Sequence, residues 1–212
     1  MPALIEIFEM LLKYYGKRNW WPAQTPYEMM VGAILTQNTN WTNVEKALAS
    51  MGDYLTPQSV LQLTNEKLAK LIHASGFHNM KAIKLKALTQ WYQKYNFDLE
   101  LVKKQEGQFL RNELLAVKGV GRETADSILT YALDKTFFVI DTYTKRILSR
   151  LGFVIPKEYD EIRTMIENQV PRDLYIYNEF HALIVQHAKE HCKKKPVCLS
   201  CPLGEFCQRK ID

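Results

Sequence analysis

The sequence lacks several features, and each absence excludes a class of protein. No apolar run is long enough to cross a lipid bilayer, and the first residues lack the pattern of a secretory signal. We therefore expect a soluble cytoplasmic protein with no membrane partner. There is no low-complexity segment, no Gly/Ser-rich linker and no internal repeat, so repeat and linker-joined architectures are excluded. With 212 residues, the chain is long enough for one large domain or two small intertwined ones.

Alternation of apolar and polar residues is also missing, which argues against a β-sheet. The one candidate strand, Phe137–Ile140, is too short to establish one. Leu4, Ile7 and Leu11 instead recur at helical spacing, and the first helix should end near Gly16. The sequence therefore predicts an all-α fold. Pro26 and the capping box Thr42–Glu45 mark the next helix starts, and further helices are expected at 57–63, 66–73, 81–95, 109–116, 123–133, 142–151, 159–169 and 174–190.

Cysteine does not occur before position 192. The four cysteines form the pattern Cys192-x5-Cys198-x2-Cys201-x5-Cys207. In a chain without a secretion signal, such clustering favours metal ligation over disulfides. Four thiolates around a C-x2-C core are a strong metal signal, but the spacing alone does not separate zinc from an iron–sulfur cluster.

Charge of either sign is moderate, with a formal net charge of +5 and an isoelectric point of about 8.9. This balance is a mild bias towards a polyanionic partner. A run of three lysines, Lys193-Lys194-Lys195, lies between the first two cysteines. Held on a metal-ordered loop, these lysines would face DNA phosphates; the simpler interpretation is a solvated surface.

The stretch Leu114–Arg146 carries the densest pattern in the chain. It reads as a helix, a Gly119-Val120-Gly121 turn, a second helix, and an apolar run that ends at Asp141. Amides just before a helix N-terminus carry partial positive charge and suit a phosphate oxygen. An aspartate at a helix N-cap accepts helix amides and favours its ionised form.

This pattern, followed by the cysteine cluster, resembles the helix-hairpin-helix (HhH-GPD) base-excision DNA glycosylases, and within them the endonuclease III branch. The resemblance covers nearly the whole chain. It implies two helical lobes with the active-site cleft between them. One is a six-helix bundle near 22–135 with its hairpin at about 109–133, and the other joins 1–21 to 136–212 and carries the cluster loop 192–207. It also implies a partner, double-stranded DNA with a damaged base, and we expect a monomer.

The resemblance makes Asp141 the candidate catalytic residue. A carboxylate near the deoxyribose would stabilise the positive charge that develops as the glycosidic bond breaks, and would orient water. The simpler interpretation is a helix cap without chemistry.

Position 123 separates two kinds of family member. Bifunctional members carry a lysine there, whose amine forms a Schiff base with the sugar. This chain has Glu123, so we predict a monofunctional glycosylase without lyase activity. Glu123 either adds a second anion to the base pocket or merely solubilises its helix. Two alternatives remain: a bifunctional glycosylase/AP lyase for oxidised pyrimidines that uses another lysine such as Lys145, and a helix-hairpin-helix DNA-binding protein without catalysis.

The Trp-Trp-Pro and Leu-Thr-Gln-Asn-Thr segments resemble the 3-methyladenine glycosylase subgroup. Alkylated purines such as 3-methyladenine are cationic and stack well on aromatic faces. Trp20, Trp21 and Trp41 are therefore candidate walls of the base pocket, although each could equally be a core residue.

Other positions are predicted to contact DNA. By the resemblance, Gln37 fills the space left by a flipped base, and the loop with Phe77 and His78 wedges the opposite strand. The hairpin would grip the backbone through Lys118, Gly119, Gly121 and Arg122. The resemblance also favours a [4Fe-4S] cluster over zinc at the four cysteines, although the first gap is one residue shorter than the usual six of the family.

Overall fold

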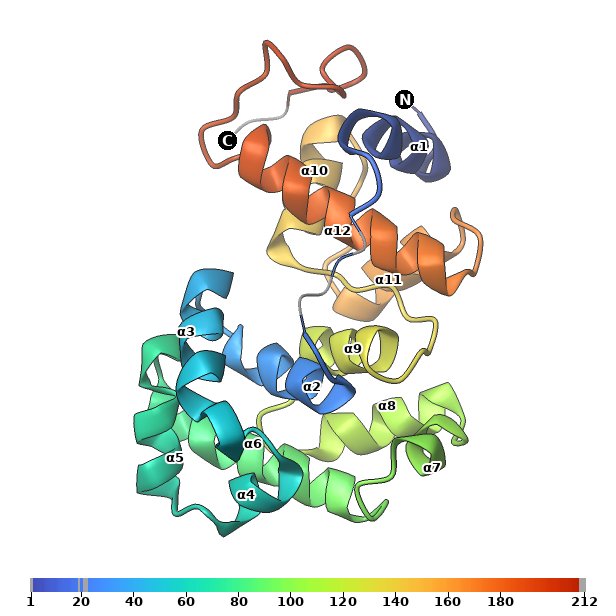
Figure 1. Ribbon diagram of the computed structural model, residues 1–212. Coiled ribbons are helices and arrows are strands. Elements are labelled where there is room, and N and C mark those ends of the chain that lie inside the picture. Colours follow the sequence, from blue (N-terminus) through green and yellow to red (C-terminus); the bar gives the residue numbers. More distant parts are fainter. Residues whose placement is uncertain (1, 19, 21–22, 210–212) are drawn as a thin grey trace. The chain divides into compact units, whose positions relative to one another are not determined.

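A computed structural model describes residues 2–18, 20 and 23–209. Within these residues the chain contains α-helices, two short 3-10 helices and no strand, which confirms the all-α prediction (Figure 1). It divides into two compact units. Unit 1 comprises Met1–Trp20 with Thr136–Asp212, and unit 2 comprises Trp21–Lys135.

Unit 2 is built from consecutive helices of the middle of the chain. Its elements are α2 (Pro26–Leu35), α3 (Trp41–Met51), η1 (Gly52–Tyr54), α4 (Pro57–Gln62), α5 (Asn65–Leu71), η2 (His73–Ser75), α6 (His78–Gln93), α7 (Leu99–Lys103), α8 (Gly107–Ala116) and α9 (Arg122–Tyr131). The apolar helix α2 packs against α3, α6 and α9, and is buried along almost its whole length. It therefore forms the centre of this unit.

Unit 1 combines the N-terminal helix with the C-terminal part of the chain. Its elements are α1 (Leu4–Tyr15), α10 (Thr142–Leu151), α11 (Tyr159–Glu167) and α12 (Leu174–Glu190). Helix α12 packs against both α1 and α10. Phe138 and Phe180 pack edge to face in the core of this unit, with ring centroids 5.6 Å apart, and Phe8 packs on Phe180 in the same way. The C-terminal loop then follows α12, drawn in red in Figure 1.

Polar side chains start most helices by accepting the first free amides. Thr25 caps α2 and is followed by Pro26 at the first helical position, as the sequence predicts. The predicted capping box Thr42–Glu45 is wrong, because Asn40 caps α3 by accepting the amide of Asn43. The helix therefore begins at Trp41, and Thr42 lies within its first turn, after the capping position.

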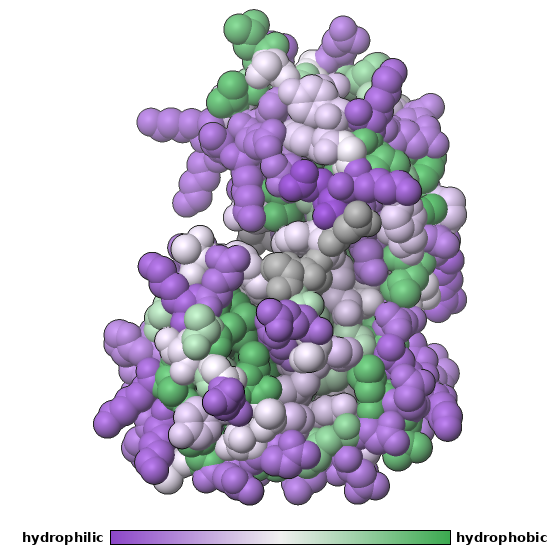
Figure 2. Space-filling model, in the orientation of Figure 1, coloured by the Kyte–Doolittle hydropathy of each residue, from purple (hydrophilic) through white to green (hydrophobic). Residues whose placement is uncertain are grey.

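Hydrophilic side chains cover most of the face shown in Figure 2, and apolar ones are scattered among them. Among the described residues, no helix is long and apolar enough to span a membrane. The exposed apolar side chains include Phe77.

Candidate active site and cysteine cluster

The helix-hairpin-helix consists of α8, the turn and α9. The backbone of Gly119 has φ +87°, a conformation that favours glycine. Gly121 is the N-cap of α9, and both glycines are exposed while Val120 between them is buried. The turn therefore presents backbone amides beside a helix N-terminus, where the partial positive charge suits an anion.

A buried ion pair holds the two hairpin helices together. The Arg111 Nε of α8 donates to Asp126 Oδ1 of α9 at 2.6 Å, and Nη2 donates to Oδ2 at 3.3 Å. The two side chains are 6% and 0% exposed. A two-pronged contact of this kind fixes orientation as well as distance.

Gln37, which follows α2, is tied directly to the hairpin. Its Nε2 donates to the carbonyl of Gly119 at 3.0 Å and to Thr124 Oγ1 at 3.1 Å. Its Oε1 accepts a hydrogen bond from the ammonium of Lys84 on α6. The structure thus brings together two predicted DNA-binding positions, Gln37 and Gly119.

Lys84 also explains why residue 119 is glycine. A Cβ built on Gly119 would lie 2.3 Å from Lys84 Cγ, so any other side chain would displace Lys84. The glycine therefore allows both the positive φ and the close approach of the lysine chain.

Phe77 and His78 stand at the start of α6. Phe77 is 69% exposed and has φ +47°, a strained backbone for a bulky residue. The His78 ring lies against that of His73, with centroids 4.6 Å apart. An exposed aromatic on a strained backbone fits a part in binding better than a part in the core.

Of the remaining predicted residues of unit 2, all but Trp41 are exposed. Glu123 is exposed in the first turn of α9, beside exposed Arg122, and Lys118 is exposed in the turn. Trp41 is half-buried at the start of α3.

Asp141, in unit 1, caps α10. Its Oδ1 accepts the Thr144 amide at 2.7 Å and the Thr144 hydroxyl at 2.8 Å. The side chain is 13% exposed, and its other oxygen, Oδ2, lies 3.6 Å from Nε2 of buried His181 on α12. The predicted helix cap is confirmed, and it engages only one of the two carboxylate oxygens.

The surroundings of Asp141 favour its charged form. Burial is the largest influence and raises the pKa of the carboxyl group. The hydrogen bonding and charge of His181, with the amide and hydroxyl of Thr144, outweigh burial and hold the pKa below its ordinary value. Asp141 is therefore ionised at neutral pH.

Of the three tryptophans predicted to line the base pocket, Trp20 lies near His181, the partner of the Asp141 carboxylate. The ring of Trp20 is tilted by 46° against that of His181, with centroids 5.6 Å apart. Trp21 lies outside the described residues. Trp20, His181 and Asp141 thus form one neighbourhood in unit 1.

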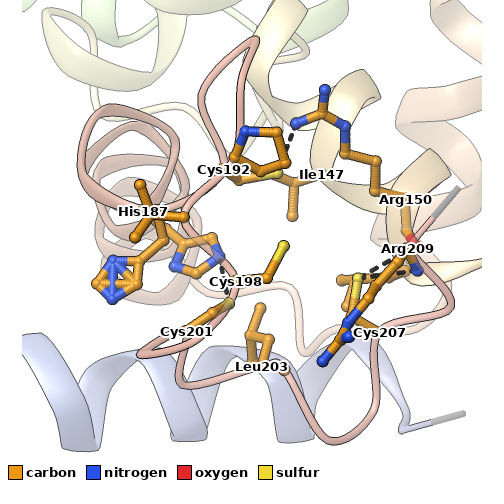
Figure 3. A pocket seen from close by; sticks show the side chains of 14 residues that line it. Ile147, Arg150, His187, Cys192, Cys198, Cys201, Leu203, Cys207 and Arg209 are labelled. Carbon is orange, nitrogen blue, oxygen red and sulfur yellow. Dashed lines mark hydrogen bonds between the residues drawn. The ribbon is translucent and has the colours of Figure 1, made fainter. Parts of the chain in front are cut away.

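The four cysteines line one cavity at the end of α12, shown in Figure 3 with apolar contributions from Ile147 and Leu203. The cysteines are unpaired thiols, each partly exposed. No three His, Cys, Asp or Glu side chains among the described residues are gathered into a site for a single metal ion. The disulfide alternative is not seen, and the sulfurs surround a shared space.

Hydrogen-bond donors point at several of these sulfurs. The Arg150 guanidinium of α10 donates to Cys192 Sγ at 3.4 Å, and the Arg209 amide donates to Cys207 Sγ at 3.4 Å. His187 Nε2 lies 3.6 Å from Cys201 Sγ. Donors of this kind suit thiolates that bind a metal centre.

Arginines of α10 also hold the loop with the lysine run. Arg150 donates to the carbonyls of Lys193 and Lys194 at 2.6 and 3.1 Å, and Arg146 donates to that of Cys192 at 2.9 Å. Lys193, Lys194 and Lys195 are all exposed. The lysines therefore project from a loop whose backbone is fixed to a helix.

Sequence reasoning missed four positions that organise these sites: Lys81, Lys84, His181 and Arg150. Lys81 and Lys84 stand three residues apart on α6, and Lys81 is buried among apolar positions. A lysine in such a position was a signal that could have been noticed. His181 and Arg150 gave none, because their partners are distant in sequence.

A family model described as HhH-GPD superfamily base excision DNA repair protein matches residues 31–172. A putative DNA repair glycosylase of Methanocaldococcus jannaschii is 50% identical, over 98% of this chain and 96% of that protein. Endonuclease III of Thermotoga maritima is 29% identical, over 86% of this chain and 83% of that protein.

Two solved structures are similar in fold. The H. pylori 3-methyladenine DNA glycosylase bound to 1,N6-ethenoadenine has a TM-score of 0.78 and 29% identity, covering 89% of this chain and 98% of its own. A non-covalent endonuclease III–DNA complex has a TM-score of 0.83 at 24% identity, covering 99% and 97%. The second likeness concerns the fold alone.

Proposed function

The chain belongs to the HhH-GPD superfamily of base excision DNA repair proteins, and from this premise we propose that it is a monofunctional DNA N-glycosylase that removes alkylated purines. Its partner is double-stranded DNA that contains a damaged base. Solved relatives are named as complexes with DNA or with a modified adenine, which supports this partner.

The observation that carries the proposal is Glu123. It lies in the first turn of α9, directly after Arg122. By the resemblance, this is the position at which bifunctional members carry the lysine that forms the imine. A carboxylate cannot form a Schiff base with the sugar. Base removal by this chain is therefore hydrolytic, with no strand cleavage.

Asp141 supports this hydrolysis by its charge. As the C1′–N bond breaks, the electron pair leaves with the base and positive charge develops on the deoxyribose. Water then adds to C1′ and releases its proton to the surrounding solvent, while a cationic purine departs as a neutral base. An ionised carboxylate near the sugar stabilises that charge. Because its pKa is held low, Asp141 is a weak base, and its role is electrostatic stabilisation and orientation of the water more than proton removal.

Alkylated purines fit this machinery. Purines alkylated at N3 or N7, such as 3-methyladenine and 7-methylguanine, are cationic in DNA, leave readily and need little help from a general acid, so the site must select them by stacking and charge. Trp20 and Trp41 are the described aromatic candidates, and Glu123 would add negative charge. The 29% identity to the H. pylori 3-methyladenine glycosylase supports this substrate class.

DNA contact is proposed for the exposed residues around the hairpin and the cluster loop. Lys118, Gly119, Gly121 and Arg122 would hold the backbone, with the lysines 193–195 adding sequence-independent affinity. Gln37 and the Phe77–His78 loop would occupy the duplex after the base leaves it.

We propose that the four cysteines hold a [4Fe-4S] cluster, which the family resemblance favours over zinc. Their four sulfurs surround one space with an apolar floor, and donors from Arg150 and Arg209 point at two of them. Cys192, Cys198, Cys201 and Cys207 would each hold one iron. When bound, the cluster would order the loop 192–207, and the lysine run would then be held in a fixed position towards the DNA backbone.

A base-release assay tests the proposal. Duplex oligonucleotides and methylated DNA are incubated with the protein, and the free base and the abasic product are measured separately from strand breaks. We expect release of 3-methyladenine or 7-methylguanine, with strand breaks only after alkali. Release of oxidised pyrimidines instead, with breaks formed directly, would contradict the proposal.

Borohydride trapping addresses the bifunctional alternative. A covalent protein–DNA adduct that disappears with Lys145→Gln would establish lyase chemistry at another lysine. The non-catalytic alternative prevails if the protein binds damaged duplexes but releases no alkylated, deaminated, oxidised or mismatched base.

A further inference from the structure

Lys81 is a buried cation that joins two segments of unit 2. Its side chain belongs to α6 and the residue is 1% exposed. The ammonium donates to the carbonyl of Leu35 at 2.8 Å and to that of Ser75 at 2.7 Å. One point charge therefore binds two backbone positions that are 40 residues apart in the sequence.

The two carbonyls lie immediately before the two segments that would enter DNA. Leu35 is the last residue of α2, two positions before Gln37. Ser75 is the last residue of η2, two positions before Phe77. The ammonium is thus two residues from each of the side chains that would fill and wedge the opened duplex.

Burial of this charge has a cost that packing alone does not explain. Desolvation lowers the pKa of Lys81 to about 8, so the folded protein holds the ammonium less readily than water does. A methionine of similar length would fill the space without this cost. The carbonyl at the C-terminus of α2 carries partial negative charge, which favours a cation there.

A neighbouring contact extends the same connection to the hairpin. Lys84, three residues along α6, donates to Gln37 Oε1, and Gln37 Nε2 donates to Gly119 and Thr124. Helix α6 thus connects the Gln37 segment both to the Phe77 loop, through Lys81, and to the hairpin, through Lys84.

We propose that Lys81 is a positioning residue that sets the separation between the Gln37 segment and the Phe77 loop, so that both enter the duplex at one base pair. This inference rests on the proposed glycosylase function. Two side chains that act together on one opened base pair must be held in register before binding, and a displacement of about 1 Å can reduce a rate about 100-fold. Phe77 itself is exposed on a strained backbone, so its position depends on the residues that anchor the loop.

The test compares two substrates that differ in how much opening they require. One duplex carries the alkylated purine that the base-release panel shows to be excised fastest, paired with a normal base. The other carries it opposite a tetrahydrofuran abasic-site analogue, where no partner base has to be separated. The measured quantity is kcat/KM for base release on each.

Lys81→Met should lower kcat/KM on the paired substrate about 10- to 100-fold and on the unpaired substrate less than threefold. Lys86→Met is the matched control, because Lys86 is on the same helix and donates only a long 3.4 Å bond to the Leu61 carbonyl; both its rates should stay within twofold. An equal loss on both substrates would mean that Lys81 is structural only and would overturn the inference.

Lys81→Arg keeps the charge and serves if Lys81→Met does not fold. The larger guanidinium cannot hold both carbonyls where the ammonium does, so the ratio of paired to unpaired activity should fall at least fivefold, whether or not overpacking also lowers the melting temperature. An unchanged ratio would overturn the inference. If the wild type releases no base from any substrate, the proposed function itself fails, which is a different outcome.

Discussion

The Nε2 atom of His181 lies 3.6 Å from Oδ2 of Asp141, on the side of the carboxylate that the helix cap leaves unused. Asp141→Asn keeps a capping oxygen but removes the charge. We expect base release to fall about 100- to 1,000-fold, as when a preorganised electrostatic group is lost. Affinity for damaged duplex, measured by fluorescence anisotropy, should change by less than threefold. Base release within threefold of wild type would contradict the catalytic role.

The same carboxylate should link stability to pH. The pKa of Asp141 in the folded protein lies below the ordinary value of an aspartate, so the charged form stabilises the fold at a pH above that ordinary value. This stabilisation is lost as the pH falls through the lower, folded-state pKa. Urea unfolding of wild type and Asp141→Asn should therefore differ near pH 5, and the difference should shrink as the pH falls until the curves converge at the most acidic pH. A difference independent of pH would contradict the pKa direction.

The buried pair Arg111–Asp126 should dominate the stability of the hairpin. Asp126→Ala leaves a buried guanidinium without its carboxylate and should cost about 3–5 kcal/mol in the free energy of unfolding. The double variant Arg111→Met/Asp126→Leu should recover most of this loss. The exposed pair Lys103–Asp134 is a matched control, and Asp134→Asn should cost less than about 1 kcal/mol. Equal costs at the two pairs would contradict the role of burial.

Local sequence signals located most of the helices. Pro26 and Asp141 each mark the start of a helix through contacts within three or four residues, so the sequence alone indicates these two starts. Boundaries were less exact where a local choice was open. Helix α6 begins at His78, three residues before the predicted start at 81. The left-handed backbone conformation of Phe77 ends the preceding turn, so the helix can begin directly after it. The five-residue α7 was missed because it is too short to show a periodicity.

Contacts between distant residues could not be predicted in the same way. The resemblance named Gln37 and Asp141, but no local pattern indicates that Lys84 reaches Gln37 or that His181 faces Asp141. These contacts depend on how helices that are distant in the sequence pack together, which local sequence patterns do not reveal. The cysteine spacing indicated a metal site, whereas the arginine donors to the loop emerged only from the fold.

Glu123→Lys tests whether position 123 faces the sugar. An amine at this place should attack C1′ and form a Schiff base, so borohydride should trap a covalent adduct on damaged duplex, and strand cleavage should appear. Arg122→Lys is the matched control one position away, and it should give no adduct. Trapping of wild type and control to the same extent would mean that another lysine supplies the chemistry.

The cysteine cavity leads to a prediction about metal content and loop order. The purified protein should be brown, absorb near the thiolate-to-iron charge-transfer band and contain about four irons per chain. Cys198→Ser should lower the iron content and the rate of base release. The pH dependence of that rate should not change, because the cluster would order the loop without contacting the sugar. Removal of the metal should also expose the loop 192–207 to trypsin, which cuts after its lysines.

The prediction extends to the helix that holds this loop. Arg150→Met removes the donor to Cys192 Sγ and to the carbonyls of Lys193 and Lys194 while leaving all four cysteines in place. The cluster should then be lost faster to a chelator, and the dependence of DNA affinity on salt should weaken as the lysine run loses its fixed position. Arg163→Met is not a suitable control, because Arg163 packs on buried Phe137. Arg172→Met removes the hydrogen bond to Thr136 and should leave both properties unchanged. A colourless protein that carries one zinc and no iron would contradict the assignment of the cluster, since one zinc would bind all four sulfurs at a single point.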